Sequence, residues 1–546
     1  MAKLIYPLGE QSFKAIREAG KVYVDKTAYI PMLLENKFYF LSRPRRFGKS
    51  LLLSTLEAFF LGRRDLFKGL AVDSFEWNWE EHPVIRIDLN GIDYTQGNDA
   101  LTVRIESTLA AYEAKFGISQ TCTLPAERFR NLITEAAGKL GRKVVVLVDE
   151  YEKPLLDTLE NETLNRQYRE SLRGIYSVLK SVDEHLRLVF LTGVTRFGQI
   201  NIFSALNNLL DISLDPRFSA ICGITEEEIQ GVLHEGVNAL AQRHDISYDE
   251  AIQKLKDYYD GYHFSSDLTD IYNPYSLLTA LSTGIIEDIW MQTGNSYYLL
   301  SQLRKCGFDF FELEGVVADS STLRGMDPEY LDPITLLYQS GYLTIKGLGQ
   351  RENTYILGLP NHEVATALYS TVVPFCLGTK GKLKPKDYDK IASWLNNGEI
   401  ENFLNWMKQL FSKLSYDFKL LPLSDRLQQE SDFQFVIFSI LSLACGLENV
   451  EAEETTSNGR MDITVSTNRY LYILELKMGE DAAKALDQIN AKDYASRWAA
   501  DERQIVKVGV AFSPESRTIS DFATEPSDCP QSNSGGIPPG RHHGSS

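Results

Sequence analysis

The sequence predicts an α/β protein of about three domains, in which a largely parallel sheet comes first, a mainly helical part follows, and a smaller α/β domain comes last. Three observations support this prediction. The chain has 546 residues, whereas a single domain typically holds roughly 100–200. Short apolar runs alternate with helical patterns over the first 215 residues. Hydrophobic residues make up 43% and charged residues 24% of the chain, which is typical of globular rather than fibrous or disordered proteins.

Four short runs rich in β-branched and aromatic residues predict the strands of the first domain, residues 1–215. They are Phe38–Ser42, Val84–Asp88, Val144–Val148 and Leu186–Leu191. Helical patterns separate these runs, and strands joined through helices pair in parallel.

A phosphate-binding motif follows the first strand. Residues Arg43 to Ser50 read Arg-Pro-Arg-Arg-Phe-Gly-Lys-Ser and lead into a helical pattern that ends near Phe60. In a loop of this kind, backbone N–H groups bind the phosphates, Lys49 reaches the β- and γ-oxygens, and the Ser50 hydroxyl ligates Mg²⁺. The predicted nucleotide-binding residues are Arg46, Phe47, Gly48, Lys49, Ser50 and Leu51. Since the general motif has glycine where Arg43 stands, an ordinary helix start is the alternative.

Two acids follow the third predicted strand. Asp149 and Glu150 come directly after the apolar run 144–148, and the carboxyl ends of parallel strands lie on the ligand side of a sheet. We expect Asp149 to hold the Mg²⁺ and Glu150 to polarise the attacking water. The alternative is a surface strand end with two solvated acids. Thr192 and Arg196, after the next strand, are candidate phosphate sensors, although a simple turn explains them equally well.

Charge is unevenly distributed along the chain. The net charge is −18, yet residues 1–70 carry 13 Lys and Arg against 6 Asp and Glu, so this part favours an anionic ligand. The arginines of the loop (Arg43, Arg45 and Arg46) either contact phosphate or nucleic acid, or pair with neighbouring acids that hold the loop. His263 either contacts the nucleotide or is a packed core histidine.

The middle part, residues 216–378, is mainly helical. Helical patterns cover Glu226–Arg243 and Tyr248–Tyr259, and the apolar runs Tyr342–Ile345 and Thr354–Leu357 predict a winged-helix-like hairpin around Gly347 and Gly349.

The segment Gly378–Lys386, rich in Gly and Lys, is the best linker candidate, and the Pro-, Ser- and Gly-rich residues 526–546 predict a disordered tail. The last domain, residues 379–525, should run helix, helix, strand, strand, helix, strand.

This last domain carries an acid–lysine pattern. Glu475 and Lys477 share one face of a predicted strand because side chains alternate, and Asp462 begins the preceding strand. Two carboxylates can hold Mg²⁺ that activates water at a phosphodiester, and a neighbouring lysine can stabilise the charge that develops there. An exposed ion pair would explain Glu475 and Lys477 alone. Gln488 and Lys492 lie one turn apart on a helix predicted over 481–498.

Several motifs together resemble the AAA-ATPase-like family. They are Tyr23-Val-Asp-Lys-Thr27, the loop ending Arg-Pro-Arg-Arg-Phe-Gly-Lys-Ser, Val148-Asp-Glu-Tyr151, Phe203-Ser-Ala-Leu-Asn-Asn208, Tyr259-Asp-Gly-Tyr262 and Tyr272-Asn-Pro-Tyr-Ser276. The family's own loop carries these arginines. The resemblance implies an ATP-binding P-loop NTPase fold over most of the first 280 residues.

Members of this family often end in a PD-(D/E)XK nuclease-like domain, which residues 423–525 resemble. This second resemblance implies a restriction-endonuclease-like fold, with Asp462 and Glu475 as metal-binding acids, Lys477 as the catalytic lysine, and Gln488 as the helix residue found in several nuclease branches. Glu453 or Glu454 could complete the metal shell.

Two functions compete. The first is an ATPase that regulates or powers a Mg²⁺-dependent nuclease acting on nucleic acid, with DNA favoured. The second is an ATP-gated switch whose last domain only docks nucleic acid or protein. A DNA-mobilising or defence role rests on the domain pairing alone. An arginine finger supplied by a second copy, with Arg196 and Arg217 as candidates, would make the protein a homo-oligomer.

The sequence also bears on the compartment. Six scattered cysteines predict neither a disulfide framework nor structural zinc. Residues 1–10 lack a signal-peptide pattern, and the longest apolar stretch, Phe435–Leu447, is shorter than the roughly 20 residues of a membrane span. We therefore expect a cytoplasmic protein without membrane segments.

Overall fold

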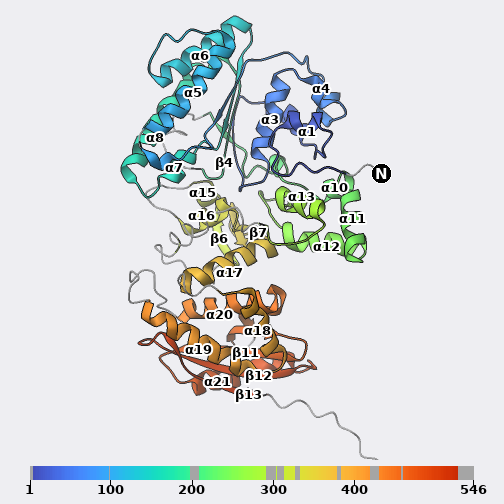
Figure 1. Ribbon diagram of the computed structural model, residues 1–546, viewed down its shortest axis with the longest axis vertical. Helices are drawn as coiled ribbons and strands as arrows, with labels where there is room; N and C mark the ends of the chain where they lie inside the picture. Colours follow the sequence, from blue (N-terminus) through green and yellow to red (C-terminus); the bar gives the residue numbers. More distant parts are fainter. Residues whose placement is uncertain are drawn as a thin grey trace, which may run out of the picture. The chain divides into compact units, whose positions relative to one another are not determined.

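The computed structural model describes residues 4–97, 99–196, 208–289, 303, 313–325, 332–377, 383–417, 430–456 and 459–526. The chain forms two compact units. The first contains residues 1–308 and 312–368, and the second contains residues 309–311 and 369–546 (Figure 1).

The first unit is built on a five-stranded sheet whose strands are all parallel. Their order is β2 (Val84–Asp88), β3 (Val144–Asp149), β4 (Leu186–Gly193), β1 (Phe38–Ser42) and β5 (Leu210–Asp211). Every residue of β3 is buried, as expected for a strand covered on both faces. Because β4 lies between β1 and β3, the carboxyl ends of these three strands meet at one edge of the sheet.

Helices cover both faces of this sheet (Figure 1). One face carries α1 (Phe13–Glu18), α3 (Lys49–Phe60) and α4 (Arg64–Phe67), and the other carries α5 (Asp99–Phe116), α6 (Pro125–Leu140), α7 (Lys153–Asp157) and α8 (Glu162–Ser181). The short α2 (Ile30–Leu33) precedes β1. The four strands predicted from the sequence are therefore present, in a parallel sheet between two helical layers.

A helical part completes the first unit. It contains α10 (Glu226–Gly231), α11 (His234–His244), α12 (Tyr248–Tyr259) and α13 (Pro274–Thr283), which share a core with Val22 of the N-terminal segment. The single helix expected over 226–243 is thus wrong: it is divided, and α10 ends at Gly231, a poor helix former. Capping boxes at Thr225 and Ser247 start α10 and α12.

Three strands form a second, antiparallel sheet in this unit. Its order is β6 (Val316–Asp319), β8 (Thr354–Gly358) and β7 (Thr344–Leu348), accompanied by α15 (Ser320–Arg324) and α16 (Pro333–Ser340). The helix α17 (His362–Leu377) begins in this unit, and its residues from Tyr369 on belong to the second. The predicted hairpin is the pair β7–β8. Gly347 lies inside β7 rather than in the turn, where Asn353 adopts a left-handed conformation instead.

The second unit packs helices against a mixed five-stranded sheet. The helices are α18 (Pro385–Asn396), α19 (Ile400–Asp417), α20 (Glu430–Cys445) and α21 (Ala482–Ala491). The strand order is β13 (Thr518–Pro526), β12 (Gln504–Ser513), β11 (Tyr470–Met478), β10 (Gly459–Ser466) and β9 (Val450–Thr456), and only β11 and β12 pair in parallel.

This unit contains more elements than the sequence predicted, since a third helix precedes the sheet and two further strands flank it. The helix expected over 481–498 ends at Ala491, because Asp493 takes a left-handed conformation before a short 3₁₀ turn at Tyr494–Trp498. Part of the linker candidate, residues 383–386, is described, and Pro385 already begins α18. The tail predicted over 526–546 lies outside the described residues beyond Pro526.

Within the described ranges, none of the helices combines the length and apolarity that crossing a bilayer requires. In the same ranges Cys122, Cys222 and Cys445 are free thiols.

Candidate functional site

The loop between β1 and α3 holds the predicted phosphate-binding motif. Gly48 and Arg46 both have positive φ angles, 90° and 68°, which turn the chain sharply before the helix begins at Lys49. The Lys49 side chain folds back over the loop, and its Nζ donates hydrogen bonds to the carbonyl oxygens of Arg43 (2.9 Å) and Pro44 (3.1 Å). The lysine is thus held at the position that phosphate would approach.

The acids at and after the end of β3 act on Lys49 electrostatically. Burial lowers the pKa of Lys49, and the charges of Glu150, Glu152 and Asp149 oppose this effect. That the loop lysine and the two acids after β3 form one site stays a prediction.

Asp149 is buried between three elements. It is 1% exposed; its Oδ1 accepts a hydrogen bond from Thr192 Oγ1 (2.9 Å), and its Oδ2 lies 3.2 Å from Arg86 Nη2. The same nitrogen of Arg86 lies 3.4 Å from the carbonyl oxygen of Ser50. Arg86 therefore links the acid of β3 to the start of α3, and Thr192 at the end of β4 orients the carboxylate.

The arginines proposed as sensors or fingers have aspartate partners. Arg196 Nη1 lies 2.7 Å from Asp211 Oδ2, and Arg217 Nη2 lies 2.7 Å from Asp215 Oδ2. Each would have to exchange its partner before it could contact a nucleotide. Glu150, the predicted base, is partly exposed and has a left-handed backbone (φ 49°).

The loop arginines have distinct roles. Arg43 is 2% exposed, and its guanidinium donates to the carbonyl oxygens of Ser42, Ser213, Phe218 and Ser219. The idea that it pairs with acids is therefore wrong, because backbone carbonyls are its partners.

The other two arginines differ from Arg43 in exposure. Arg46 stacks its guanidinium 3.8 Å from the ring centre of Tyr275, whereas Arg45 is exposed. Arg43 is thus buried, Arg46 partly buried and Arg45 exposed.

Aromatic residues of the helical part fix the loop from the other side. Phe47 packs edge-to-face against Tyr262 (ring centres 4.8 Å apart) and Phe264 (5.3 Å). His263 between them is not directed at a phosphate: its Nδ1 lies 2.6 Å from the Ile345 carbonyl oxygen and its Nε2 lies 2.7 Å from an Asp270 carboxylate oxygen. Both ring nitrogens have protein partners, as expected of a packed histidine.

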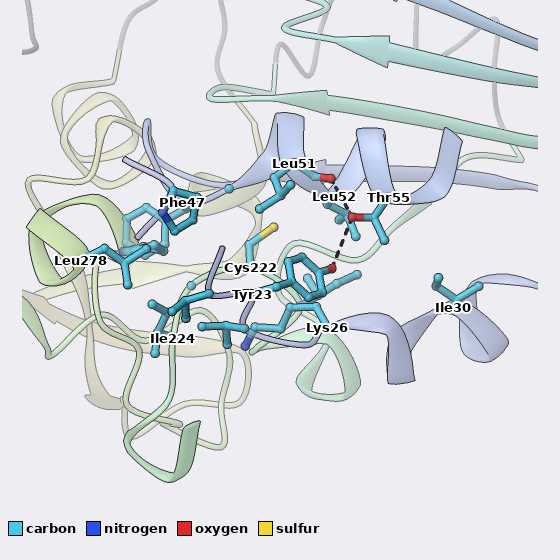
Figure 2. Close-up of a pocket in the computed structure, with 17 residues that line it drawn as sticks. Tyr23, Lys26, Ile30, Phe47, Leu51, Leu52, Thr55, Cys222, Ile224 and Leu278 are labelled. Carbon is cyan, nitrogen blue, oxygen red and sulfur yellow. Dashed lines mark hydrogen bonds between the residues drawn. The ribbon is translucent and has the colours of Figure 1, made fainter. Parts of the chain in front are cut away.

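A pocket opens beside this loop (Figure 2). Gly48 and Leu51 form part of its wall, together with mainly apolar residues from three other segments: Val22, Tyr23, Ile221, Cys222, Ile224 and Leu278. The Tyr23 hydroxyl lies 3.3 Å from Thr55 Oγ1, and Lys26 Nζ donates to Glu228 Oε2 (2.7 Å). Sequence reasoning missed this pocket, although the motif around Tyr23 was visible.

The second unit brings its predicted acids and lysine together. Ile463 pairs with Leu474 across β10 and β11, so Asp462 and Glu475 are neighbours on adjacent strands, and Asp462 Oδ2 accepts from the Leu476 N–H (2.7 Å).

Glu475 occupies the middle of this arrangement. It is 1% exposed, and its Oε1 accepts from Lys477 Nζ (3.0 Å) and from the Gln488 side-chain amide. Its second oxygen, Oε2, is buried without a hydrogen-bond partner.

Burial and the charge of Asp462 together raise the pKa of Glu475 to about 7. For Lys477, partial burial lowers the pKa, but the hydrogen bond to Glu475 and the charges of Glu475, Asp462 and Glu430 together outweigh it, and the net change is upward. The carboxylates repel each other in a poorly solvated place, and such an arrangement favours a bound cation.

Comparisons with known proteins match the two domains that carry these residues. A family model described as "Predicted AAA-ATPase" matches residues 7–203, and one for the PD-(D/E)XK nuclease superfamily matches residues 428–522. The chain is also 34% identical, over 534 residues, to an "Uncharacterized protein in vnfD 5'region" of Azotobacter chroococcum mcd 1; the alignment covers 96% of this chain and 99% of that relative. The chain belongs to the AAA-ATPase-like family.

The two family models match both predicted domains. The AAA-ATPase domain lies in the N-terminal part of the chain, and the PD-(D/E)XK domain lies in the second unit. Several predicted residues stay untested. The side chains of Glu453 and Glu454 and the motif residues 203–207 lie outside the described parts. Lys492 is the C-terminal cap of α21.

Two residues of the nuclease-like site were missed. Glu430, at the start of α20, accepts a hydrogen bond from the Met478 N–H (2.7 Å), and its charge acts on Glu475 and Lys477. Tyr494 is hydrogen-bonded to Gln488, the residue that also holds Glu475. The only available signal for Glu430 was its position at the start of a long apolar helix.

Proposed function

We propose that the chain binds and hydrolyses ATP in its first unit and that the second unit is a Mg²⁺-dependent nuclease that cleaves DNA phosphodiesters. The observation that carries the ATPase half is the link through Arg86 between the buried Asp149, at the end of β3, and the carbonyl oxygen of Ser50, which follows the loop lysine at the start of α3. At the edge where parallel strands end, the first turn of a following helix supplies backbone N–H groups for phosphate.

In the ATPase site, the backbone of Arg46 to Leu51 would bind the phosphates, and Lys49 would exchange its loop carbonyls for phosphate oxygens. This exchange is favourable because a hydrogen bond to an anion is stronger than one to a neutral carbonyl. Glu150 would take the proton of the attacking water.

Ser50 and Asp149 would hold the Mg²⁺. Their fit rests on chemistry present at the site: a buried carboxylate linked through Arg86 to the backbone of Ser50, and oxygen ligands of the type that Mg²⁺ prefers. When bound, Mg²⁺ neutralises charge on the phosphates.

The base of the nucleotide would occupy the apolar pocket beside Gly48. The pocket is continuous with the phosphate loop through Gly48 and Leu51, and its walls are mostly hydrocarbon and aromatic. Flat, weakly polar rings such as purines suit walls of this kind.

In the nuclease site, Asp462 and Glu475 would hold Mg²⁺, with Glu430 close by. Across the part of the chain that the structure describes, no three His, Cys, Asp or Glu side chains are gathered closely enough to hold a metal. The fit rests instead on the buried, unpartnered Oε2 of Glu475 beside the charge of Asp462. When bound, the ion supplies charge neutralisation and an activated water. Lys477 would stabilise the scissile phosphate.

The experiment is cleavage of linear double-stranded and single-stranded DNA in Mg²⁺ or Mn²⁺, with and without ATP, by the wild type and Lys477→Ala. Lys484, which is 62% exposed on the following helix, gives the matched control Lys484→Ala. Loss of cleavage in Lys477→Ala but not in Lys484→Ala supports the nuclease. A dependence of wild-type cleavage on ATP would show that the ATPase and nuclease sites are coupled. Equal cleavage by both variants would contradict the nuclease.

The second candidate is an ATP-gated switch. It is favoured by the contacts of Arg43 and Phe47 with residues 213–219 and 262–264, since a nucleotide that moves the loop would also move the helical part. Tight ATP binding without any DNA cleavage, in either metal, would select this function.

A further inference from the structure

Glu152 is a buried acid to which the sequence assigns no role. It follows Glu150 by two residues, caps the start of α7, and is 1% exposed. Its Oε1 accepts two backbone hydrogen bonds, from Val194 (2.5 Å) and from Thr195 (3.0 Å). One carboxylate therefore joins the turn after β3 to the segment that leaves β4.

Two further contacts tie the same segments together. The Tyr151 N–H donates to the carbonyl oxygen of Thr192 (3.1 Å). Gly193 lies against the Glu152 carboxyl so closely that a Cβ at this position would overlap its oxygens. The turn that carries Glu150 is thus fitted against the end of β4 and the residues after it at four successive positions, 192 to 195.

We propose that Glu152 is a positioning residue for ATP hydrolysis, which holds Glu150 and Thr192 in register across the ends of β3 and β4. This inference rests on the proposed ATPase function. Glu152 is not assigned the role of the base, because its carboxyl is buried, with Oε1 bonded to the two amides of the β4 segment and Oε2 shielded from solvent.

The surroundings of Glu152 explain why an acid can remain there. Its Oε2 is buried without a hydrogen-bond partner, and burial raises the pKa of Glu152 to about 7. The carbonyl oxygen of a neutral carboxyl can still accept the two amide bonds, although more weakly than a carboxylate, and the neutral form avoids an uncompensated buried charge. Glutamine, with the same shape and a carbonyl acceptor, should therefore substitute for it.

The strain that Glu150 carries indicates what is lost without Glu152. Glu150 has a left-handed backbone (φ 49°), which persists only where surrounding structure holds it. Without the bond to Val194 and Thr195 the turn can relax, and Glu150 moves away from the phosphate. A displacement of about 1 Å at a reacting group can cost about 100-fold in rate.

The test compares ATP affinity and turnover in the full chain for the wild type, Glu152→Gln, Glu152→Ala and the control Glu170→Ala, an exposed acid on α8. We expect Glu152→Ala to lower kcat about 100-fold while the Kd for ATP stays within about twofold. Glu152→Gln should restore most of the turnover. This division between kcat and Kd, and the rescue by glutamine, would not follow from general loss of structure.

Amide hydrogen exchange gives a second readout. The Val194 and Thr195 amides should exchange about tenfold faster in Glu152→Ala and at the wild-type rate in Glu152→Gln. Unchanged kcat in Glu152→Ala, or equal losses in the alanine and glutamine variants, would overturn the inference alone. A wild type that does not hydrolyse ATP would overturn the proposed function and this inference with it.

Discussion

Each unit places a lysine beside buried carboxylates, but the two lysines differ in their hydrogen-bond partners. Lys49 donates to neutral carbonyl oxygens of its own loop, whereas Lys477 donates to the carboxylate of Glu475. A phosphate can replace the carbonyls at Lys49, because the charged bond is stronger. At Lys477 the carboxylate of Glu475 already serves as the anion. The oxygen of that carboxylate without a hydrogen-bond partner, Oε2, is open to a cation instead. In the proposed function, the first site therefore receives an anion and the second a cation.

The largest effect that would sharpen this contrast is on DNA cleavage. Lys477→Ala should lower the cleavage rate about 10³-fold, comparable to the loss of a group that stabilises charge in a transition state. ATP affinity, measured by fluorescence anisotropy of a labelled nucleotide, should not change. A parallel loss of ATP binding would mean that the two sites are not separate.

Arg43→Gly restores the residue that general phosphate loops carry at this position. It should nevertheless destabilise the first unit by about 3 kcal/mol, because four carbonyl oxygens lose a charged donor. Hydrogen exchange followed by mass spectrometry reports the two units separately and should show faster exchange only in the first. Arg45→Gly, two residues along the same loop and exposed, is the control. Equal stability of the two variants would show that Arg43 is not a structural residue.

Lys49→Ala should weaken ATP binding about 100-fold, since hydrogen bonds to charged groups contribute about 1.5–3 kcal/mol. Calorimetric titration measures the change, and Lys14→Ala, an exposed lysine on α1, should bind ATP like the wild type. DNA cleavage in the absence of ATP should persist in Lys49→Ala. If it disappears, the two sites depend on each other even without nucleotide.

Features of the fold and of the two sites could be predicted where the residues that form them are close together in the sequence, and not where those residues are far apart. Asp149 follows a continuous apolar strand, and Glu475 and Lys477 share a face by simple alternation, so both sites were visible locally. Glu430 reaches its site only because α20 packs on the sheet, which no local pattern encodes. The role of Arg43 was also invisible, since its partners lie about 170 residues away.

The pocket beside Gly48 offers a milder test through Cys222, which lies in its wall and is 3% exposed. ATP at about ten times its Kd should slow alkylation of Cys222 about tenfold, because only the free protein reacts. Mass spectrometry of the modified peptides measures the rate, and Cys445 of the second unit is an internal control. Equal protection of Cys222 by inorganic triphosphate, which has no base, would show that the base of ATP binds outside this pocket.

The smallest effect concerns a carboxyl of the first unit outside both sites. Burial raises the pKa of Asp260 to about 6, above the value of about 3.9 in unfolded chains. The folded state therefore binds this proton more tightly, and the stability it contributes below pH 4 is lost as the pH rises towards 6. Asp260→Asn should gain about 1 kcal/mol of stability relative to the wild type between pH 4 and pH 5, the first part of this loss, as measured by thermal unfolding. A stability difference between the two proteins that does not change with pH would show that Asp260 does not titrate in this range.

The contacts of Arg43 and Phe47 also bear on where the nucleotide-binding fold can be cut. The family match ends at residue 203, but Arg43 bonds to carbonyls at 213, 218 and 219, and Phe47 is enclosed by Tyr262 and Phe264. A fragment trimmed to residue 203 would leave the Arg43 guanidinium with only the Ser42 carbonyl of its four acceptors, and the Phe47 ring without its two aromatic neighbours. The smallest piece able to fold with an intact loop extends at least through Tyr275, the residue on which Arg46 stacks.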